Sequence, residues 1–239
     1  MSSLSQRYLA ARRDPGLVVL EGFHPLKHAW LQGAKVLAVH TCSHDEVLRT
    51  SQSLSPTLTE RFAKEMQPLP TAQFKILSPD YIKTGVIALA RKPVYSLEEI
   101  LARPGQIVYL EQVRNLNNLG AIVRTLAARG VAGLLYSGTL NVWHPRCVST
   151  ARGLQLALPV VRVPELPVIT GRTLIGFDER GELLDEVALP SNAVLAFGSE
   201  RSGLSAPTRE RLDRTVRIPM QANVSSLNLA TAVAIGVYR

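Results

Sequence analysis

Four short apolar runs in the second half of the chain most constrain what this sequence can fold into. They are "QIVYLEQV", "VAGLLYS", "TLIGFD" and "AVLAFGS". Continuous apolar runs of this length are typical of strands buried on both faces in a parallel sheet. A helical segment separates the first two runs, because Leu119, Ile122, Val123 and Leu126 recur at helical spacing and Gly130 is a C-cap candidate. The sequence therefore predicts an α/β domain built on a parallel sheet.

A smaller α/β unit is predicted before it. Strands are expected at "LVVLEG", "KVLAVHT" and "GVIALARK", with a helix over "PLKHAWLQG" that closes at Gly33 and a longer helical region over 56–66. The stretch "KPVYSLEEILARPGQ" then combines prolines at both ends, a short acidic helical piece and a Pro-Gly turn. We predict one domain over 1–95, a linker over 96–104 and a second domain over 105–239.

The charge of the chain favours a polyanionic partner. The formal net charge is +8 and the isoelectric point is about 9.9. Residues 1–103 carry six Lys and seven Arg, whereas residues 104–239 carry fourteen Arg and no Lys. The planar fork of Arg grips phosphate in two places, which points to nucleic acid. Genome composition is an equally good explanation of the same bias.

The expected compartment is a reducing cytoplasm. No apolar run approaches the roughly 20 residues that cross a bilayer, so no membrane association is expected. Cys42 and Cys147 define no disulfide framework. The start of the chain, "MSSLSQRYLAARRDPG", lacks the apolar core of a secretory signal. It favours a basic surface helix over an organelle transit peptide.

Three common kinds of ligand site are not supported by the sequence pattern. The loop "GSERSGLS" resembles a phosphate loop, but Leu204 stands where the lysine is required. No dinucleotide fingerprint follows any of the predicted strands. His40, Cys42 and His44 lie close together without a fourth ligand, so no metal site is expected. What remains is a glycine-bounded loop directly after a buried strand, with Glu200 as its one acid, at a position where α/β sheets bind ligands.

The last candidate segment is "RIPMQANVSSLNLATAVAIGVYR". A strand is expected to end in Ile-Pro-Met, and a polar loop leads into a helix of small residues. Ser225 or Ser226 is the expected N-cap of that helix. Asn228 would then lie in the first turn of a buried helix, where its amide requires hydrogen-bond partners.

Together these three stretches resemble the TrmH/SpoU family of SPOUT methyltransferases, which methylate RNA ribose 2′-hydroxyls. "NNLGAIVRT" resembles the first family motif, "FGSERSGL" the second, and "IPM" followed by "SSLNLATAVAIG" the third. The resemblance covers about residues 105–239. More weakly, "LVVLEGFHPLKHAW" and "TGVIALARKP" resemble the ribosomal-protein-like RNA-binding module that precedes the catalytic domain in many members.

The resemblance implies a C-terminal domain whose backbone forms a deep trefoil knot, an exception to unknotted topology. It implies S-adenosylmethionine as cofactor, with contacts to the positions matching Gly198, Ile218 and Leu227. Glu200 would brace the cofactor loop or accept a hydrogen bond from Asn118 or Arg124. The family also implies a homodimer.

The family places Arg124 at the reacting hydroxyl and often describes it as the general base. Because arginine stays protonated at ordinary pH, we expect Arg124 to orient the hydroxyl and stabilise developing negative charge instead. Ser226 and Asn228 would add hydrogen bonds at the same ribose. Asn118 and Gly120 are expected to form the turn that presents Arg124 to RNA.

The sequence thus predicts an S-adenosylmethionine-dependent methyltransferase acting on a ribose 2′-hydroxyl in structured RNA, with rRNA favoured over tRNA. The alternative is a non-catalytic RNA-binding or ribosome-assembly factor that keeps the knotted cofactor fold. Retention of Arg124, Glu200, Ser226 and Asn228 favours the enzyme.

Overall fold

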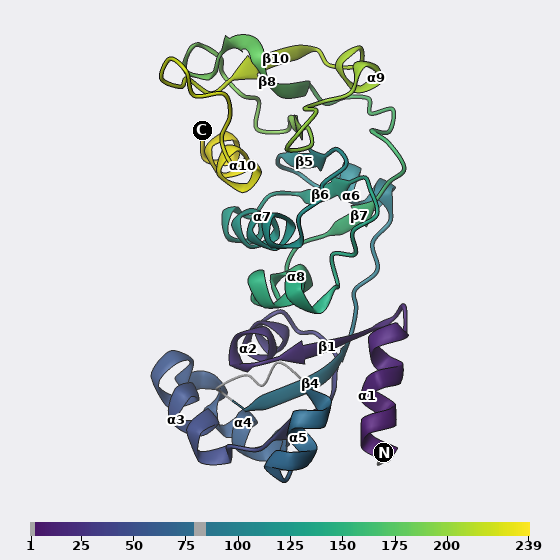
Figure 1. Ribbon diagram of the computed structural model, residues 1–239, viewed down its shortest axis with the longest axis vertical. Coiled ribbons are helices and arrows are strands. Elements are labelled where there is room, and N and C mark those ends of the chain that lie inside the picture. The colour runs from purple at the N-terminus through teal and green to yellow at the C-terminus, as the bar shows by residue number, and fades with distance from the viewer. Residues whose placement is uncertain (1–2, 79–84) are drawn as a thin grey trace. The chain divides into compact units, whose positions relative to one another are not determined.

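The computed structural model describes residues 3–78 and 85–239, and it divides into two compact units. Unit 1 comprises 1–94 and 148–157, and unit 2 comprises 95–147 and 158–239. Figure 1 labels most of the helices and many of the strands of both. Thr84, the first residue of the stretch "TGVIALARKP", lies outside the described residues.

Unit 1 is a four-stranded mixed sheet with helices around it. Its order is β1-β4-β2-β3, antiparallel except for the β2–β3 pair. The elements before residue 94 are α1 Ser3–Arg13, β1 Leu17–Glu21, α2 Phe23–Leu31, β2 Val36–Thr41, α3 His44–Leu54, η1 Pro56–Leu58, α4 Thr59–Glu65, β3 Met66–Pro68, α5 Thr71–Leu77 and β4 Val86–Arg91. The three predicted strands are confirmed, and Gly33 adopts a left-handed backbone with φ 68 just after α2.

The core of unit 1 explains why the basic first helix is ordered. Tyr8 and Ala11 of α1 are 1% and 2% exposed and pack with Phe74 and Ile87. The predicted helical region over 56–66 is confirmed, because η1 and α4 follow each other directly from Pro56 to Glu65. Helix α3 before it was not predicted. It ends before Ser55, because Pro56 restricts the residue that precedes it.

Unit 2 is a six-stranded sheet in which every strand pair is parallel, in the order β10-β8-β9-β5-β6-β7. Its elements are α6 Leu97–Ala102, β5 Ile107–Leu110, α7 Leu116–Arg129, β6 Gly133–Tyr136, β7 Val160–Arg162, β8 Leu174–Leu183, η3 Leu184–Glu186, β9 Val194–Phe197, α9 Ala206–Arg209, β10 Arg214–Arg217 and α10 Leu229–Tyr238. Helix α8, Pro145–Thr150, begins in unit 2 and ends in unit 1, and η2, Leu154–Leu156, lies in unit 1. The predicted parallel sheet is confirmed. Strands β5, β6 and β9 are buried along their whole length, as their unbroken apolar runs indicate.

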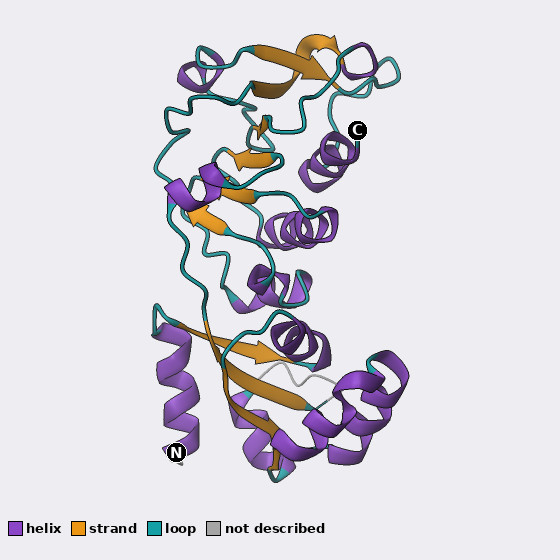
Figure 2. Ribbon diagram, turned by 180° about the vertical axis from the view of Figure 1, so that it is seen from behind, coloured by secondary structure: helices purple, strands orange, loops and turns teal. Residues whose placement is uncertain are grey.

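Helices cover both faces of this sheet (Figure 2). On one face α7 and α10 pack against each other. On the other, Ile100 of α6 joins a core with Ile107, Tyr109 and Leu135. Residues 96–104, which the sequence predicts as a linker, therefore contain a helix that belongs to the core of unit 2. A capping box of Ser96 and Glu99 starts it.

The pairing of β8 with β10 contains a large irregularity. Thr215 pairs with Gly176, but the next residue, Val216, pairs with Glu182. Residues 177–181 of β8 are therefore opposite no residue of β10, and we call this segment the β8 bulge. Gly181 is required there, because a Cβ atom would lie 2.6 Å from the backbone carbons of Thr215 and Val216.

Candidate functional site

The carboxyl ends of β5 and β9 form a topological switch point in unit 2. These two strands are neighbours in the sheet, but the chain continues from β5 to β6 on one side and from β9 toward β10 on the other. The loops that follow them therefore diverge at this edge of the sheet. In open α/β sheets ligands bind at such a point.

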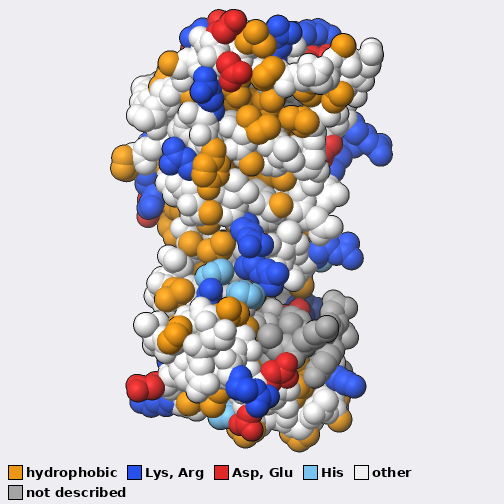
Figure 3. Space-filling view, turned by 90° about the vertical axis from the view of Figure 1, so that its left-hand side faces the viewer, with side chains coloured by type: hydrophobic (Ala, Val, Ile, Leu, Met, Phe, Trp, Pro, Cys, Tyr) orange, Lys and Arg blue, Asp and Glu red, His pale blue; other side chains and the backbone are white. Residues whose placement is uncertain are grey.

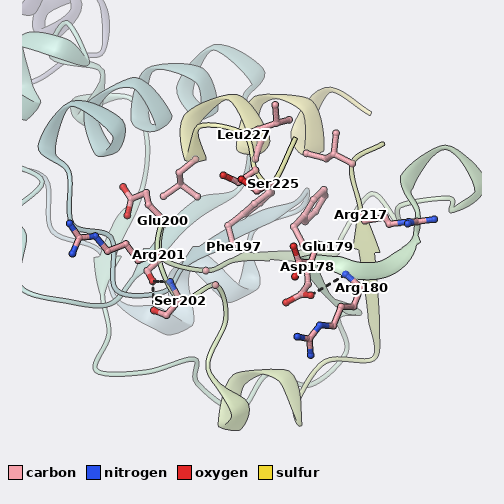
Figure 4. A pocket seen from close by; sticks show the side chains of 18 of the residues that line it. Asp178, Glu179, Arg180, Phe197, Glu200, Arg201, Ser202, Arg217, Ser225 and Leu227 are labelled. Atoms are coloured by element: carbon pink, nitrogen blue, oxygen red, sulfur yellow. Dashed lines mark hydrogen bonds between the residues drawn. The ribbon is translucent and has the colours of Figure 1, made fainter. Parts of the chain in front are cut away.

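A cavity of about 590 Å³ lies at this edge of unit 2. Figure 4 shows how its lining side chains face one another. They come from the β8 bulge, the loop after β9, and the segment from β10 to α10: Phe177–Arg180, Phe197–Gly203, Arg209, Val216–Ile218, Met220, Ser225–Leu227, Leu229 and Ala232. The volume lies within the roughly 300–1,000 Å³ typical of small-molecule sites.

Two stacked aromatic rings form an apolar wall of the cavity. The centroids of Phe177 and Phe197 are 4.3 Å apart with planes inclined by 18°. Helix α10 approaches them closely because it has no side chain at Gly236, where a Cβ atom would lie 2.7 Å and 2.9 Å from the two ring tips. The wall is therefore flat and rigid, and it suits a ligand with an apolar or aromatic part.

The loop from Gly198 to Ser205, called the β9 loop below, closes on itself. Ser199 and Gly203 exchange two backbone hydrogen bonds of 3.1 Å, and the hydroxyls of Ser199 and Ser202 are 2.7 Å apart. Gly203 adopts φ +63, which favours glycine. The backbone of this loop is thereby fixed along one side of the cavity.

The residues that the resemblance assigned to the cofactor all lie around this cavity. Gly198 and Glu200 belong to the β9 loop, and Ile218 and Leu227 come from the segment between β10 and α10. Ser226 also lines the cavity and is exposed. Segments about 20–30 residues apart in sequence thus contribute to a single cavity in unit 2.

A chain of hydrogen bonds joins the three motif segments beside the cavity. Asn118 donates from Nδ2 to Oε1 of Glu200 over 2.9 Å, and its Oδ1 accepts from Nδ2 of Asn228 over 3.1 Å. Neither asparagine lines the cavity itself. Of the two partners expected for Glu200, the structure therefore contains Asn118.

The expected turn around Asn118 and Gly120 was wrong, because both residues lie inside α7. Asn115 is the N-cap, and its side chain accepts from the backbone N–H groups of Asn117 and Asn118 over 2.8 Å and 3.1 Å. This cap starts the helix three residues before Asn118. Gly130 ends it with φ 72, as predicted.

Arg124 lies on α7, about 9 Å along the helix axis from Asn118 given the rise per residue. Its side chain is exposed and does not line the cavity. In the described part of the chain it makes no hydrogen bond or ion pair. The guanidinium is therefore available to an external ligand.

The predicted N-cap of the last helix was also wrong. Helix α10 begins at Leu229, and Asn228 caps it by accepting from the N–H of Ala230 over 2.9 Å. Asn228 is exposed, and its amide is used on both sides, since Nδ2 reaches Asn118. Ser225 and Ser226 remain in the loop beside the cavity.

Sequence reasoning missed the β8 bulge and its link to α9. Asp178, whose side chain is 9% exposed, pairs with Arg209 over 2.6 Å. Both residues line the cavity, so this pair ties two of its walls together. No local pattern marks such a pair, because its members are 31 residues apart.

Charged side chains surround the cavity, and its arginines include Arg180, Arg201 and Arg217, with Glu179 and Glu200 among them (Figure 4). Across residues 3–78 and 85–239 no three His, Cys, Asp or Glu side chains gather to hold a metal ion. No helix in the same ranges is long and apolar enough to cross a membrane.

The chain is similar in sequence to a known family of RNA methyltransferases. The model of the SpoU rRNA Methylase family matches residues 105–238. The chain is 31% identical, over 95% of its length and 83% of the relative's, to a 23S rRNA (uridine(2479)-2′-O)-methyltransferase of Streptomyces viridochromogenes. It is 29% identical, over 87% of its length and 90% of the relative's, to the 23S rRNA (guanosine-2′-O-)-methyltransferase RlmB of Acinetobacter baylyi.

Solved structures share the fold. The SpoU methyltransferase AviRb from Streptomyces viridochromogenes, crystallised with AdoMet, superposes with a TM-score of 0.79 at 24% identity. That superposition covers 100% of this chain and 96% of AviRb. A structure described as an RNA 2′-O ribose methyltransferase gives a TM-score of 0.74 at 23% identity, covering 99% and 95% of the two chains.

Proposed function

Because the chain belongs to the SpoU rRNA methylase family, we propose that it transfers a methyl group from S-adenosylmethionine to a ribose 2′-hydroxyl of rRNA. The observation that carries this proposal is the cavity between the β9 loop, the β8 bulge and the segment from β10 to α10. The three motif segments of the family meet beside it. The reaction produces a 2′-O-methyl ribose and S-adenosylhomocysteine and releases the hydroxyl proton.

The cavity fits S-adenosylmethionine in size and in chemistry. About 590 Å³ accommodates a molecule of this size, and the Phe177–Phe197 wall offers apolar contact. When bound, S-adenosylmethionine supplies an electrophilic methyl group on a sulfonium sulfur. Gly198, Ile218 and Leu227 would hold it from the two loops that they belong to, and Glu200 would keep the β9 loop in place through Asn118.

Arg124 is the proposed catalytic residue. Its exposed guanidinium is free to donate to the 2′-oxygen and to a neighbouring phosphate at the same time. A preorganised donor at an oxygen that gains negative charge lowers the barrier without having to accept a proton. Ser226 and Asn228 would position the same ribose, and Asn118 would fix Asn228 by its hydrogen bond.

The RNA partner is supported by charge as well as by family. The basic surface of the chain attracts phosphate, and the α/β unit 1 is the proposed RNA-binding unit. The names of the curated relatives favour rRNA over tRNA. The proposal places the enzyme in the cytoplasm with its substrate.

We also propose a homodimer and a trefoil knot in unit 2. Large hydrophobic side chains are exposed on the last twenty residues, among them Val224, Leu227, Ile235 and Tyr238. Hydrophobic groups gather on the face of unit 2 in view in Figure 3. Such a patch supports a self-complementary interface. If the protein is a homodimer, light scattering should give twice the chain mass of 26.1 kDa.

The return of the chain from edge strand β10 to α10, beside α7, is compatible with the proposed knot.

The function is tested by methylation of rRNA with radiolabelled S-adenosylmethionine, followed by mapping of the modified ribose. Arg124→Ala should reduce the single-turnover rate at saturating cofactor by about 10²–10³ or more, the usual effect of losing one oxyanion donor. Arg124→Lys should fail nearly as badly, since an ammonium cannot make two planar contacts. Methylation of a base instead of a ribose, or a wild-type rate for Arg124→Ala, would contradict the proposal.

A further inference from the structure

Glu111 is a carboxylate that the three motifs do not include. It follows the last residue of β5 and is only 9% exposed. Its side chain does not line the cavity. Burying a carboxylate costs free energy unless hydrogen bonds satisfy both of its oxygens. The hydrogen-bond partners of Glu111 therefore indicate its structural role.

The side chain of Glu111 holds the end of the β9 loop. Oε2 accepts from the backbone N–H of Ser205 over 2.7 Å, and Oε1 accepts from the hydroxyls of Ser205 and Thr208, each over 2.7 Å. These are short, charge-assisted hydrogen bonds, which are roughly twice as strong as neutral ones. Ser205 and Thr208 are 94 and 97 residues away in sequence.

The backbone of the same residue holds the start of the loop. The N–H of Glu111 donates to the carbonyl of Phe197 over 2.8 Å, immediately before Gly198. The residue directly after β5 therefore fixes both ends of the loop that closes one side of the cavity. Arg209, just after Thr208, extends this connection to Asp178 in the β8 bulge.

We propose that Glu111 is a positioning residue that preorganises the β9 loop for S-adenosylmethionine; this inference rests on the proposed function. Glu111 touches neither the cavity nor the hydrogen-bond chain of Asn118, and it acts through Ser205 and Thr208. A loop that is already fixed in its binding conformation loses less entropy when ligand binds. Loss of the carboxylate therefore weakens cofactor binding more than it slows the chemical step.

The test compares Glu111→Ala with Asp213→Ala in the full-length protein. Asp213 is a matched control, since its carboxylate also accepts a backbone N–H in unit 2, that of Leu174 over 2.8 Å, and it does not line the cavity. Both variants should lower the melting temperature. Only Glu111→Ala should raise the calorimetric Kd for S-adenosylmethionine, by about tenfold or more, with kcat at saturating cofactor within about threefold of wild type.

A double-mutant cycle tests whether Glu111 acts on the β9 loop through Thr208. Thr208→Val keeps the side-chain volume and removes the hydroxyl that donates to Glu111 and accepts from Ser205, so the Kd for S-adenosylmethionine should rise by about threefold. Added to Glu111→Ala it should have little further effect, because the charged acceptor of that hydroxyl is already gone. If Glu111→Ala does not fold, Thr208→Val alone decides the question.

The possible results distinguish failure of the proposed function from failure of the role of Glu111. A wild-type protein that does not bind S-adenosylmethionine overturns the proposed function and this inference with it. A wild type that binds, with Kd unchanged in Glu111→Ala or, failing that variant, in Thr208→Val, overturns only the role of Glu111. Equal rises in Kd for Glu111→Ala and Asp213→Ala would also overturn it, because general destabilisation would then explain both.

Discussion

Replacement of Gly198 by alanine tests whether the β9 loop needs its present backbone. A Cβ atom there would lie 1.9 Å from the carbonyl carbon of Gly203 and 2.2 Å from the backbone nitrogen of Leu204. Neither contact can be relieved by a side-chain rotation, since both partners are backbone atoms. The strand end and the far side of the loop must therefore move apart by more than an ångström.

The loss of folding free energy caused by that movement can be worked out from the contacts that it disrupts. It breaks the two backbone hydrogen bonds between Ser199 and Gly203, worth about 1 kcal/mol each. It also displaces Leu204, which is 1% exposed in the core of unit 2, and overpacking adds about 1–3 kcal/mol. We expect Gly198→Ala to lower the free energy of unfolding of unit 2 by about 3 kcal/mol or more.

Differential scanning calorimetry measures this loss, and titration calorimetry measures cofactor binding on the folded variant. We expect the melting temperature of unit 2 to fall by about 10 °C and the Kd for S-adenosylmethionine to rise at least about tenfold. Gly16→Ala is the control, because the only atom near its Cβ is an Asp14 oxygen at an ordinary 3.4 Å. Wild-type stability and Kd in Gly198→Ala would refute the steric argument.

Three further predictions concern other parts of the chain. Arg172→Met should destabilise unit 2 by about 2–3 kcal/mol in urea unfolding. The guanidinium of Arg172 donates to four backbone carbonyls, those of Leu101, Arg103, Gly105 and Asn192. Arg162→Met is the control, because the Arg162 side chain is exposed, and a similar loss of stability there would contradict the prediction. Burial, reinforced by Arg7, lowers the pKa of His40, so the unfolded chain binds more protons than the folded one as pH falls. The stability of unit 1 should therefore be full above about pH 6.5 and decline below it, and His40→Gln should remove that decline in urea midpoints measured from pH 5 to 8. RNA affinity should fall steeply as salt rises, and an affinity equal at about 50 and 200 mM salt would remove the role of the basic surface.

The strands of unit 2 could be predicted from sequence because burial on both faces leaves a one-dimensional signal. Each of β5, β6 and β9 is an unbroken apolar run, so composition alone identifies it. The short edge strands β3 and β7 were missed, because three residues with exposed positions carry no such signal. Helix starts were misplaced where several polar residues compete for the cap, as with Ser225, Ser226 and Asn228.

The candidate site, like the fold, could be predicted from sequence only in part. The sequence resemblance singled out three motif segments. Two of them line the cavity, and the first is joined to the other two by the hydrogen bonds of Asn118. The contacts that hold the cavity together could not be predicted, because Glu111–Ser205 and Asp178–Arg209 join residues far apart in the chain. Such contacts depend on strand order and register, which no local pattern specifies.

The β8 bulge also bears on how relatives of this chain can diverge. Its residues, 177–181, have no partners on β10, while the pairs at Thr215–Gly176 and Val216–Glu182 fix the ladder on both sides. Insertions or deletions there leave the flanking register unchanged. Because Phe177 to Arg180 line the cavity, selection can reshape one wall of the site without rebuilding the sheet. Alignments of related sequences should therefore place their gaps in this segment, and libraries that vary its length offer a direct route to altered ligand preference.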